Sequence, residues 1–231
     1  MEPLSEAGLP RGQEGLHPRL SEVVRRHLEH PDRTPVPEHT VSAYRALLAA
    51  LGPEARPLVL DSGCGTGEGT VALALRHPEA WVIGVDRSQH RLHKGPFRGL
   101  GAVRRAAGVG NAFAVRADVP GLWRLLAADG RKLAAHYVLH PNPWPKKQHM
   151  QRRWHGHPAF GSLLALGGEV TLVSNFSVYA EEFAAALTVA RPALGEVRAE
   201  VYVPDPPLTR FEAKYVERGH PLWRVVARLG G

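Results

Sequence analysis

A glycine-rich stretch that begins with an acid carries the clearest chemical signal in this sequence. Asp61 is followed by Gly63, Gly65 and Gly67, with one other residue between successive glycines. Glycines let the backbone turn sharply and approach a ligand closely. A second acid, Asp86, lies 25 residues after Asp61 at the end of another apolar run, where a carboxylate can hydrogen-bond ribose hydroxyls. The pattern predicts a ligand that contains a nucleoside.

The spacing of the glycines and the charge before them narrow the class of ligand. The glycines follow Gly-x-Gly-x-Gly, whereas dinucleotide-binding loops follow Gly-x-Gly-x-x-Gly or Ala. The carboxylate of Asp61 would repel phosphates, but it can pair with the ammonium group of an amino acid. A ribose, an adenine and an amino acid occur together in S-adenosylmethionine, which we therefore predict as the cofactor.

A third acid, Asp118, ends the apolar run that precedes Pro120. Its carboxylate could accept a hydrogen bond from the adenine amino group, cap the helix that starts near Pro120, or do both. The predicted cofactor contacts are therefore Asp61, Gly63, Gly65, Gly67, Asp86 and Asp118.

A proline-rich turn followed by cations is the second feature that could do chemistry. Residues 141–145 contain three prolines around Asn142 and Trp144. Prolines fix the backbone φ and hold neighbouring side chains in place at low entropic cost. The cations that follow are of the kind that contacts RNA phosphates, and they are Lys146, Lys147, His149, Arg152 and Arg153. We predict that the turn is the floor of an active site and that the cations edge a nucleic-acid surface.

The elements that must position these residues alternate between strands and helices. Apolar runs predict strands over 58–60, 81–85, 111–118, 132–139, 169–175, 197–203 and 223–227, the last two antiparallel at one edge. Helical spacing predicts helices over 38–51, 68–76, from 120, and over 178–190, and a basic helical segment over 89–107 that breaks near 95. Because open α/β sheets bind ligands at the carboxyl ends of their strands, both features above should meet at that edge.

Composition places the chain among single-domain proteins of the α/β class. Its 231 residues suffice for one full core. The single cysteine, Cys64, excludes a disulfide framework, and the histidines have no metal-ligand spacing, so no metal is predicted. No apolar run approaches the roughly 20 residues of a membrane span, and no hydrophobic signal core precedes the domain. We expect a cytoplasmic protein without membrane contact, either a monomer or a homodimer.

The charge balance and the N-terminal region point to a polyanionic partner. The formal charge is +7 and the isoelectric point is near 10.0, which is compatible with nucleic-acid binding. Residues 1–37 are rich in proline and arginine, and this composition predicts a largely disordered basic arm with a helical turn around residues 20–30. The domain itself is expected to span residues 38–231.

Taken together, the motifs resemble those of the bacterial tRNA (guanine-N7-)-methyltransferases, which are class I S-adenosylmethionine-dependent enzymes. The likeness runs from about residue 59 to residue 226. It rests on the sequences at 60–67, 84–88, 141–149 with 152–153, and 209–212. The first motif is shared by many methyltransferases, and the last two are specific to this family. The resemblance implies a Rossmann-like, mostly parallel seven-stranded sheet with helices on both faces, and tRNA as the partner.

The resemblance also implies roles for individual residues. Asn142 would lie at the reaction centre as the catalytic position. Lys146 and residues 148–153 would meet tRNA. The target nucleoside would be held by Asn175, Thr209, Arg210 and Glu212.

Two positions depart from the pattern of this family. Asn142 and Asn175 stand where the family has aspartate, and an amide offers one donor and one acceptor where a carboxylate offers only acceptors. Asn-Pro-Trp is also partly similar to the Asn-Pro-Pro-Tyr/Trp motif of methyltransferases that act on planar amino groups. Three interpretations stay open: a guanine-N7 enzyme with altered contacts, most directly implied; a methyltransferase with an amino-group target; and a non-catalytic RNA- or cofactor-binding protein.

Overall fold

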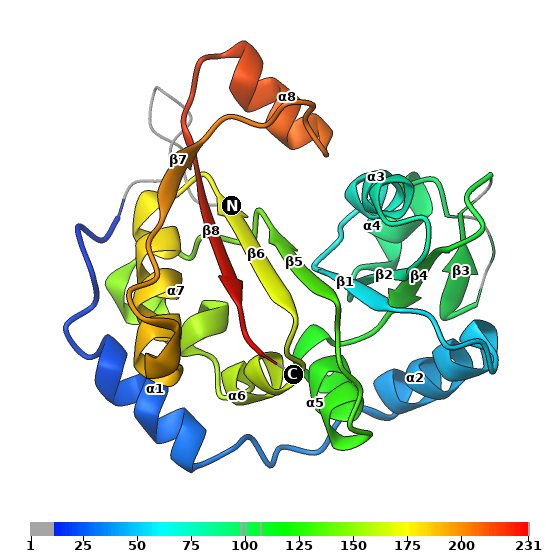
Figure 1. Ribbon diagram of the computed structural model, residues 1–231, viewed down its shortest axis with the longest axis horizontal. Helices are drawn as coiled ribbons and strands as arrows, with labels where there is room; N and C mark the ends of the chain where they lie inside the picture. The colour runs from blue at the N-terminus through cyan, green and yellow to red at the C-terminus, as the bar shows by residue number, and fades with distance from the viewer. Residues whose placement is uncertain (1–11, 98, 100, 107, 231) are drawn as a thin grey trace.

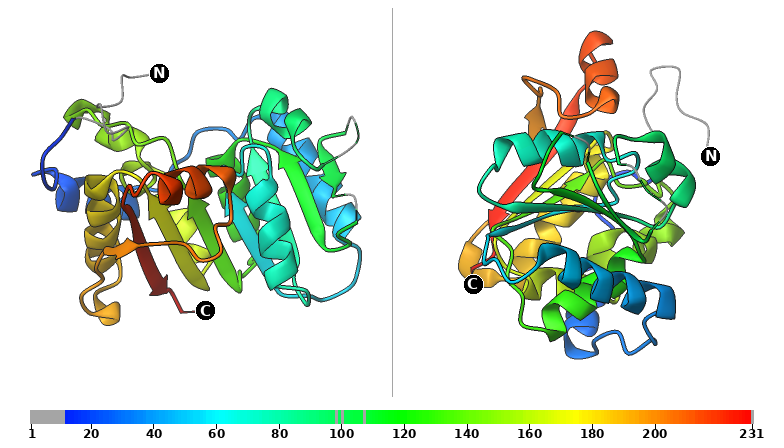
Figure 2. Two further views of the ribbon diagram at one scale, coloured as in Figure 1. Left: turned by 90° about the horizontal axis from the view of Figure 1, so that it is seen from above. Right: turned by 90° about the vertical axis from the view of Figure 1, so that its right-hand side faces the viewer.

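One twisted sheet with helices on both faces forms the molecule (Figures 1 and 2). The computed structural model describes residues 12–97, 99, 101–106 and 108–230. Within these residues the strand order is β3-β4-β2-β1-β5-β6-β8-β7. The predicted α/β, Rossmann-like architecture is confirmed, but the sheet has eight strands and not seven.

The five central strands run in parallel and carry the site at their carboxyl ends. They are β1 (Leu58–Ser62), β2 (Trp81–Asp86), β4 (Ala112–Arg116), β5 (Ala135–Leu139) and β6 (Glu169–Ser174). Every residue of β1 and β2 is buried, as expected for strands covered on both faces. The chain proceeds from β1 toward β2 and β4, and later toward β6 on the other side of β5. The strand order therefore reverses between β1 and β5, where α/β sheets bind ligands.

Antiparallel strands close both edges of the sheet. β7 (Glu200–Tyr202) and β8 (Leu222–Arg228) lie at one edge, as predicted, and β3 (Val103–Arg105) lies at the other. The helix predicted over 89–107 is wrong beyond α4 (Gln89–Lys94). The backbone of Gly95 is extended, as the residue before a proline prefers, and a Cβ there would lie 1.6 Å from the Thr66 carbonyl oxygen.

Helices cover the two faces of the sheet. Besides α4 and an N-terminal helix described below, the α-helices of the described residues are α2 (Glu38–Leu51), α3 (Glu68–Arg76), α5 (Val119–Ala128), α6 (Phe160–Ala165), α7 (Ser177–Ala190) and α8 (Arg210–Glu217). Short 3₁₀ helices are η1 (Lys147–Arg152), η2 (Trp154–Gly156) and η3 (Pro192–Leu194). The helices predicted over 38–51 and 68–76 are confirmed, whereas α8 was not predicted. No helix in the described part of the chain is long and apolar enough to cross a membrane.

The N-terminal region corrects one prediction. Residues 20–29, where only a helical turn within a largely disordered arm was expected, form the 10-residue helix α1 (Leu20–Glu29), which packs against α6 and α7. Leu20, Val23 and Val24 are buried in the main hydrophobic core, and their spacing is that of one helical face. Residues 1–11 of the predicted arm lie outside the described residues.

Candidate active site

The glycine loop after β1 is an open cradle. Gly63, Gly65 and Gly67 have φ values of +81°, +60° and +82°, a region that glycine enters without steric cost. A Cβ added at Gly63 or Gly65 would meet no atom within 4 Å, whereas one at Gly67 would lie 2.4 Å from the Phe97 ring. The first two glycines therefore border open space in which a ligand can approach the backbone.

Asp86 braces this cradle from the end of β2. One of its carboxylate oxygens, Oδ2, accepts from the backbone N–H of Gly65 at 3.0 Å. The other, Oδ1, accepts from the backbone N–H of Ser88 at 2.7 Å and lies 3.2 Å from the Arg91 guanidinium. A carboxylate has about four lone-pair positions, so Asp86 retains capacity for a ribose hydroxyl beside the loop it supports.

Asp61 is a buried carboxylate of strand β1. It is 2% exposed and accepts a hydrogen bond from the Thr70 hydroxyl at 2.6 Å. Among the described residues, none forms an ion pair with it. Burial and the nearby charge of Asp86 raise the pKa of Asp61 to about 6, against the opposing effect of the Thr70 hydrogen bond. Because a buried charge needs a partner, this site fits the ammonium group of S-adenosylmethionine.

Asp118 performs the capping role that the sequence left open. Its Oδ2 accepts from the backbone N–H of Gly121 at 2.8 Å, and its own N–H donates to the Thr40 hydroxyl. It therefore starts α5 and ties that helix to α2. A contact between Asp118 and an adenine stays a prediction.

The Asn-Pro-Trp loop after β5 has a strained backbone. His140 and Trp144, with φ values of 50° and 43°, flank the loop in the left-handed region. That conformation costs non-glycine residues about 1–3 kcal/mol each and is concentrated at functional sites. Exposed Asn142 closes a turn, since its Oδ1 accepts from the Trp144 N–H at 3.3 Å. The amide nitrogen of Asn142 has no partner among the described residues.

The cations after this loop divide into a surface group and a buried one. Lys146, Lys147 and Arg152 are exposed, and Arg152 lies over the Trp144 ring at 4.7 Å. His149 is partly buried and meets the edge of the same ring at 5.5 Å. These residues fit the predicted RNA surface.

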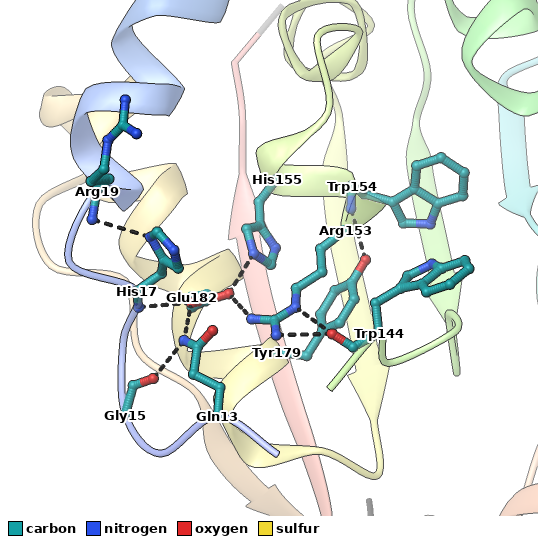
Figure 3. A network of polar contacts seen from close by, with 10 residues as sticks. All are labelled: Gln13, Gly15, His17, Arg19, Trp144, Arg153, Trp154, His155, Tyr179 and Glu182. Atoms are coloured by element: carbon teal, nitrogen blue, oxygen red, sulfur yellow. Dashed lines mark hydrogen bonds and ion pairs between the residues drawn. The ribbon is translucent and has the colours of Figure 1, made fainter. Parts of the chain in front are cut away.

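Arg153 does not belong to that surface. It is 0% exposed, and its Nε and Nη2 donate to the Trp144 carbonyl at 3.3 and 3.0 Å. Its Nη1 donates to the carboxylate of Glu182 (Figure 3). The predicted RNA contact of Arg153 is therefore wrong, because the burial of its side chain leaves no face for a phosphate.

The motif at the start of α8 lies against the Asn-Pro-Trp loop. Thr209 caps the helix by accepting from the Glu212 N–H at 3.1 Å. The Glu212 carboxylate is 0% exposed and accepts from the Leu208 N–H at 2.6 Å, with the His140 ring at 3.1 Å. Glu212 thus joins α8 to the Asn-Pro-Trp loop, and its part in holding the target nucleoside stays a prediction. Arg210 is exposed and pairs with Glu68 of α3 at 3.2 Å.

Asn175, which follows β6, contacts α8. Its Nδ2 donates to the Tyr215 hydroxyl at 2.6 Å. Phe211 stacks on Tyr215 with ring centroids 4.6 Å apart and lies 4.5 Å from the His140 ring. Phe211 is still 38% exposed. Because β5 and β6 pair in parallel and His140 N–H donates to the Val173 carbonyl, the loops that bear Asn142 and Asn175 are neighbours.

Comparison with known proteins agrees with this geometry. A family model described as "Putative methyltransferase" matches residues 55–225. The tRNA (guanine-N(7)-)-methyltransferase of Thiobacillus denitrificans is 34% identical over 190 residues, which cover 78% of this chain and 79% of the relative. The chain belongs to the tRNA (guanine-N7-)-methyltransferase family. The member of this family from Halorhodospira halophila is 30% identical over 229 residues, 96% of this chain and 89% of its own.

Solved structures match the fold of this family member at low identity. An antibiotic-related methyltransferase superposes with a TM-score of 0.55 at 17% identity, covering 79% of this chain and 92% of its own. The 16S rRNA methyltransferase KamB gives a TM-score of 0.53 at 14% identity, covering 86% and 96%. At such identities the likeness concerns the methyltransferase fold alone.

Several residues of this family member have structural roles at the site that sequence reasoning missed. They are Gln13, Thr70, His140, Glu182 and Tyr215. One of them left a signal, because Glu182 follows Tyr179 by three residues on the apolar face of an alanine-rich helix. An acid on such a face is rarely buried unless it is paired.

Proposed function

We propose that this protein methylates tRNA at N7 of a guanine with S-adenosylmethionine as the methyl donor. The observation that carries the proposal is the meeting of two structures at the switch point of the sheet. One is the open glycine cradle with the buried carboxylate of Asp61, which forms no ion pair with the residues that the structure describes. The other is the Asn-Pro-Trp loop with its exposed cations. Family membership supplies the substrate class.

The residues of the cradle bind and orient the cofactor. Asp61 would hold the ammonium group, Asp86 the ribose hydroxyls, and Gly63 and Gly65 would let the ligand approach the backbone. When bound, S-adenosylmethionine supplies an electrophilic methyl group. Guanine N7 already bears a lone pair, so the protein needs no general base and contributes mainly proximity and orientation.

The two asparagine amides offer one donor and one acceptor to a base. The Oδ1 of Asn142 is used within its own turn, which leaves the amide N–H groups available. The Nδ2 of Asn175 is used by Tyr215, which leaves the acceptor Oδ1 available. Guanine presents an acceptor, O6, beside a donor, N1–H, and this edge complements the pair.

An amino-group methyltransferase acting on adenine is the second candidate. The same two amides complement the amino donor and ring-nitrogen acceptor of an adenine edge. Asn142 in an Asn-Pro-Trp turn is the specific observation that favours it. In both cases Lys147 and Arg152 would contact backbone phosphates, and a cytoplasmic location follows from tRNA as the partner.

Transfer of a labelled methyl group to total tRNA, followed by identification of the labelled nucleoside, tests the proposal. We expect 7-methylguanosine. A methylated adenosine would establish the second candidate. Cofactor binding by calorimetry without any transfer would establish a non-catalytic protein, and an Asp86→Ala variant serves as the control that loses cofactor affinity.

A further inference from the structure

The N-terminal segment lies against the Asn-Pro-Trp loop. The backbone N–H of Gln13 donates to the Pro145 carbonyl at 2.8 Å. A Cβ at Gly12 would lie 2.2 Å from the same carbonyl oxygen, so the close approach depends on glycine. Segments far apart in the sequence therefore meet at the loop that borders the cofactor cradle.

A single buried carboxylate joins this segment to the rest of the site. The Oε1 of Glu182 accepts from Gln13 Nε2 at 2.6 Å and from the His17 N–H at 2.8 Å. Its Oε2 accepts from Arg153 and from His155 Nε2 at 2.9 Å (Figure 3). All these donors converge on one side chain that is 0% exposed.

The charge state of this group is defined by its surroundings. Burial alone raises the pKa of Glu182, but the hydrogen bonds from His155 and Gln13 and the charge of Arg153 outweigh it and bring the pKa to about 2. Burial lowers the pKa of His155, so its imidazole is neutral at pH 7. The carboxylate therefore has one buried counter-charge, the guanidinium of Arg153.

Arg153 connects Glu182 to the Asn-Pro-Trp loop. Two of its nitrogens donate to the carbonyl of Trp144, a residue in the left-handed conformation. The N–H of the same residue closes the turn on Asn142 Oδ1. A continuous set of contacts thus connects Gln13 to Asn142 through Glu182, Arg153 and Trp144.

We propose that residues 12–17 are a strap that belongs to the active site and holds the Asn142–Trp144 turn in the shape that receives the target base. This inference rests on the proposed function. Gln13 and Glu182 are positioning residues. The strap adds little to the core, since Gln13 and His17 are only partly buried and Leu16 is 49% exposed. Its contacts are polar, so its loss should leave the fold intact.

The Gln13→Ala variant tests the strap, with Glu29→Ala, at an exposed position of α1 outside the strap, as the control. Loss of a hydrogen bond to a buried carboxylate should lower kcat for tRNA methylation about 10-fold. The thermal midpoint and the cofactor dissociation constant should stay at wild-type values, and Glu29→Ala should match the wild type throughout. Unchanged kcat in Gln13→Ala, or a loss of thermal stability equal in proportion to the loss of activity, would overturn the proposal.

A spectroscopic measurement separates this inference from the proposed function. The protein labelled with fluorotryptophan gives a ¹⁹F signal for Trp144, assigned with Trp144→Phe. In Gln13→Ala and in Glu182→Gln we expect this signal to shift or broaden, while those of Trp81 and Trp223 stay in place. A Trp144 signal unaffected by Gln13→Ala would overturn the strap even if the enzyme proved to methylate another base.

Discussion

The amide nitrogen of Asn175 donates a hydrogen bond to the hydroxyl of Tyr215 at 2.6 Å. Amide orientation is assigned from such networks, and this one turns the oxygen of Asn175 away from Tyr215. No described residue donates to that oxygen. Asn175 therefore presents an acceptor to the site, as the aspartate expected there from the family resemblance would.

Exchange of Asn175 for aspartate should accordingly change little. We expect tRNA methylation by Asn175→Asp within about threefold of the wild type, because an outward acceptor is kept. Asn175→Leu removes the acceptor and should lower kcat/KM about 10-fold or more. The measurement is steady-state transfer to tRNA with nucleoside identification.

The double variant, with both Asn142→Asp and Asn175→Asp, can contradict this expectation. If 7-methylguanosine appears only in the double variant, the natural amides select another base. Tyr215→Phe is the control for orientation, since it releases the amide nitrogen while keeping the ring that stacks on Phe211.

Cofactor affinity should depend on pH through Asp61. The pKa of its buried carboxyl is about 6 in the folded protein, above the value of 3.8 for an exposed aspartate. Only the ionised form pairs with an ammonium group. We therefore expect the cofactor dissociation constant, measured by calorimetry, to rise progressively as the pH falls below about 6.

The same pKa makes a prediction of opposite sign for stability. A carboxyl with a raised pKa binds its proton more tightly in the folded state, so the unliganded protein gains stability as the pH falls from about 6 toward 4. At pH 8 the charged group costs about 3 kcal/mol. Asp61→Asn should thus raise the unliganded thermal midpoint at pH 8 while weakening cofactor binding. A variant that is less stable and binds normally would contradict both expectations.

Much of the sheet could be predicted because its central strands are uninterrupted apolar runs. β1 and β2 are buried throughout, and such strands need only hydrophobicity to be found. The three-residue strand β3 lies in an arginine-rich segment whose side chains do not alternate clearly. It exists because Arg104 pairs with Ala114 of β4, a tertiary relationship that a local pattern does not record.

The residues of the glycine cradle could be predicted from the sequence, whereas the buried residues that hold the Asn-Pro-Trp loop in place could not. The glycines and Asp86 have a fixed spacing, whereas the burial of Arg153 depends on a partner 29 residues away in α7. Helix α8 did leave a signal. Thr209 and Glu212 have the spacing of a capping box, and Thr209 does cap the helix, although the Glu212 side chain reaches the N–H of Leu208.

The two arginines at 152 and 153 should behave oppositely on substitution. Arg153→Ala leaves Glu182 charged, buried and without a counter-ion, and should cost about 3–5 kcal/mol of unfolding free energy. Arg152→Ala and Lys147→Ala, at exposed positions, should leave stability unchanged. Denaturant unfolding of all three variants checks this. Normal stability in Arg153→Ala would show that the ion pair is not formed in solution.

Binding of tRNA should show the complementary pattern for the exposed cations. Each phosphate contact contributes to the salt dependence of the affinity, so Lys147→Ala and Arg152→Ala should each reduce the slope of log K against log salt by about one. Glu14→Gln, at an exposed position in the N-terminal segment, is the control: it changes the net charge without removing a cation, and should leave the slope unchanged. An unchanged slope in both cation variants would move the RNA surface elsewhere on the molecule.

Phe211 should contribute to binding of the target base by stacking. It is a large apolar side chain of α8 that remains exposed, although it stacks on Tyr215 and meets His140. Stacking of a base on an aromatic ring is worth about 1–3 kcal/mol. We expect Phe211→Ala to lower kcat/KM for tRNA about 10-fold, Phe211→Tyr to keep it, and both to bind S-adenosylmethionine normally. Full activity in Phe211→Ala would contradict a role in base binding and leave Phe211 only a structural role, packing α8 against the Asn-Pro-Trp loop.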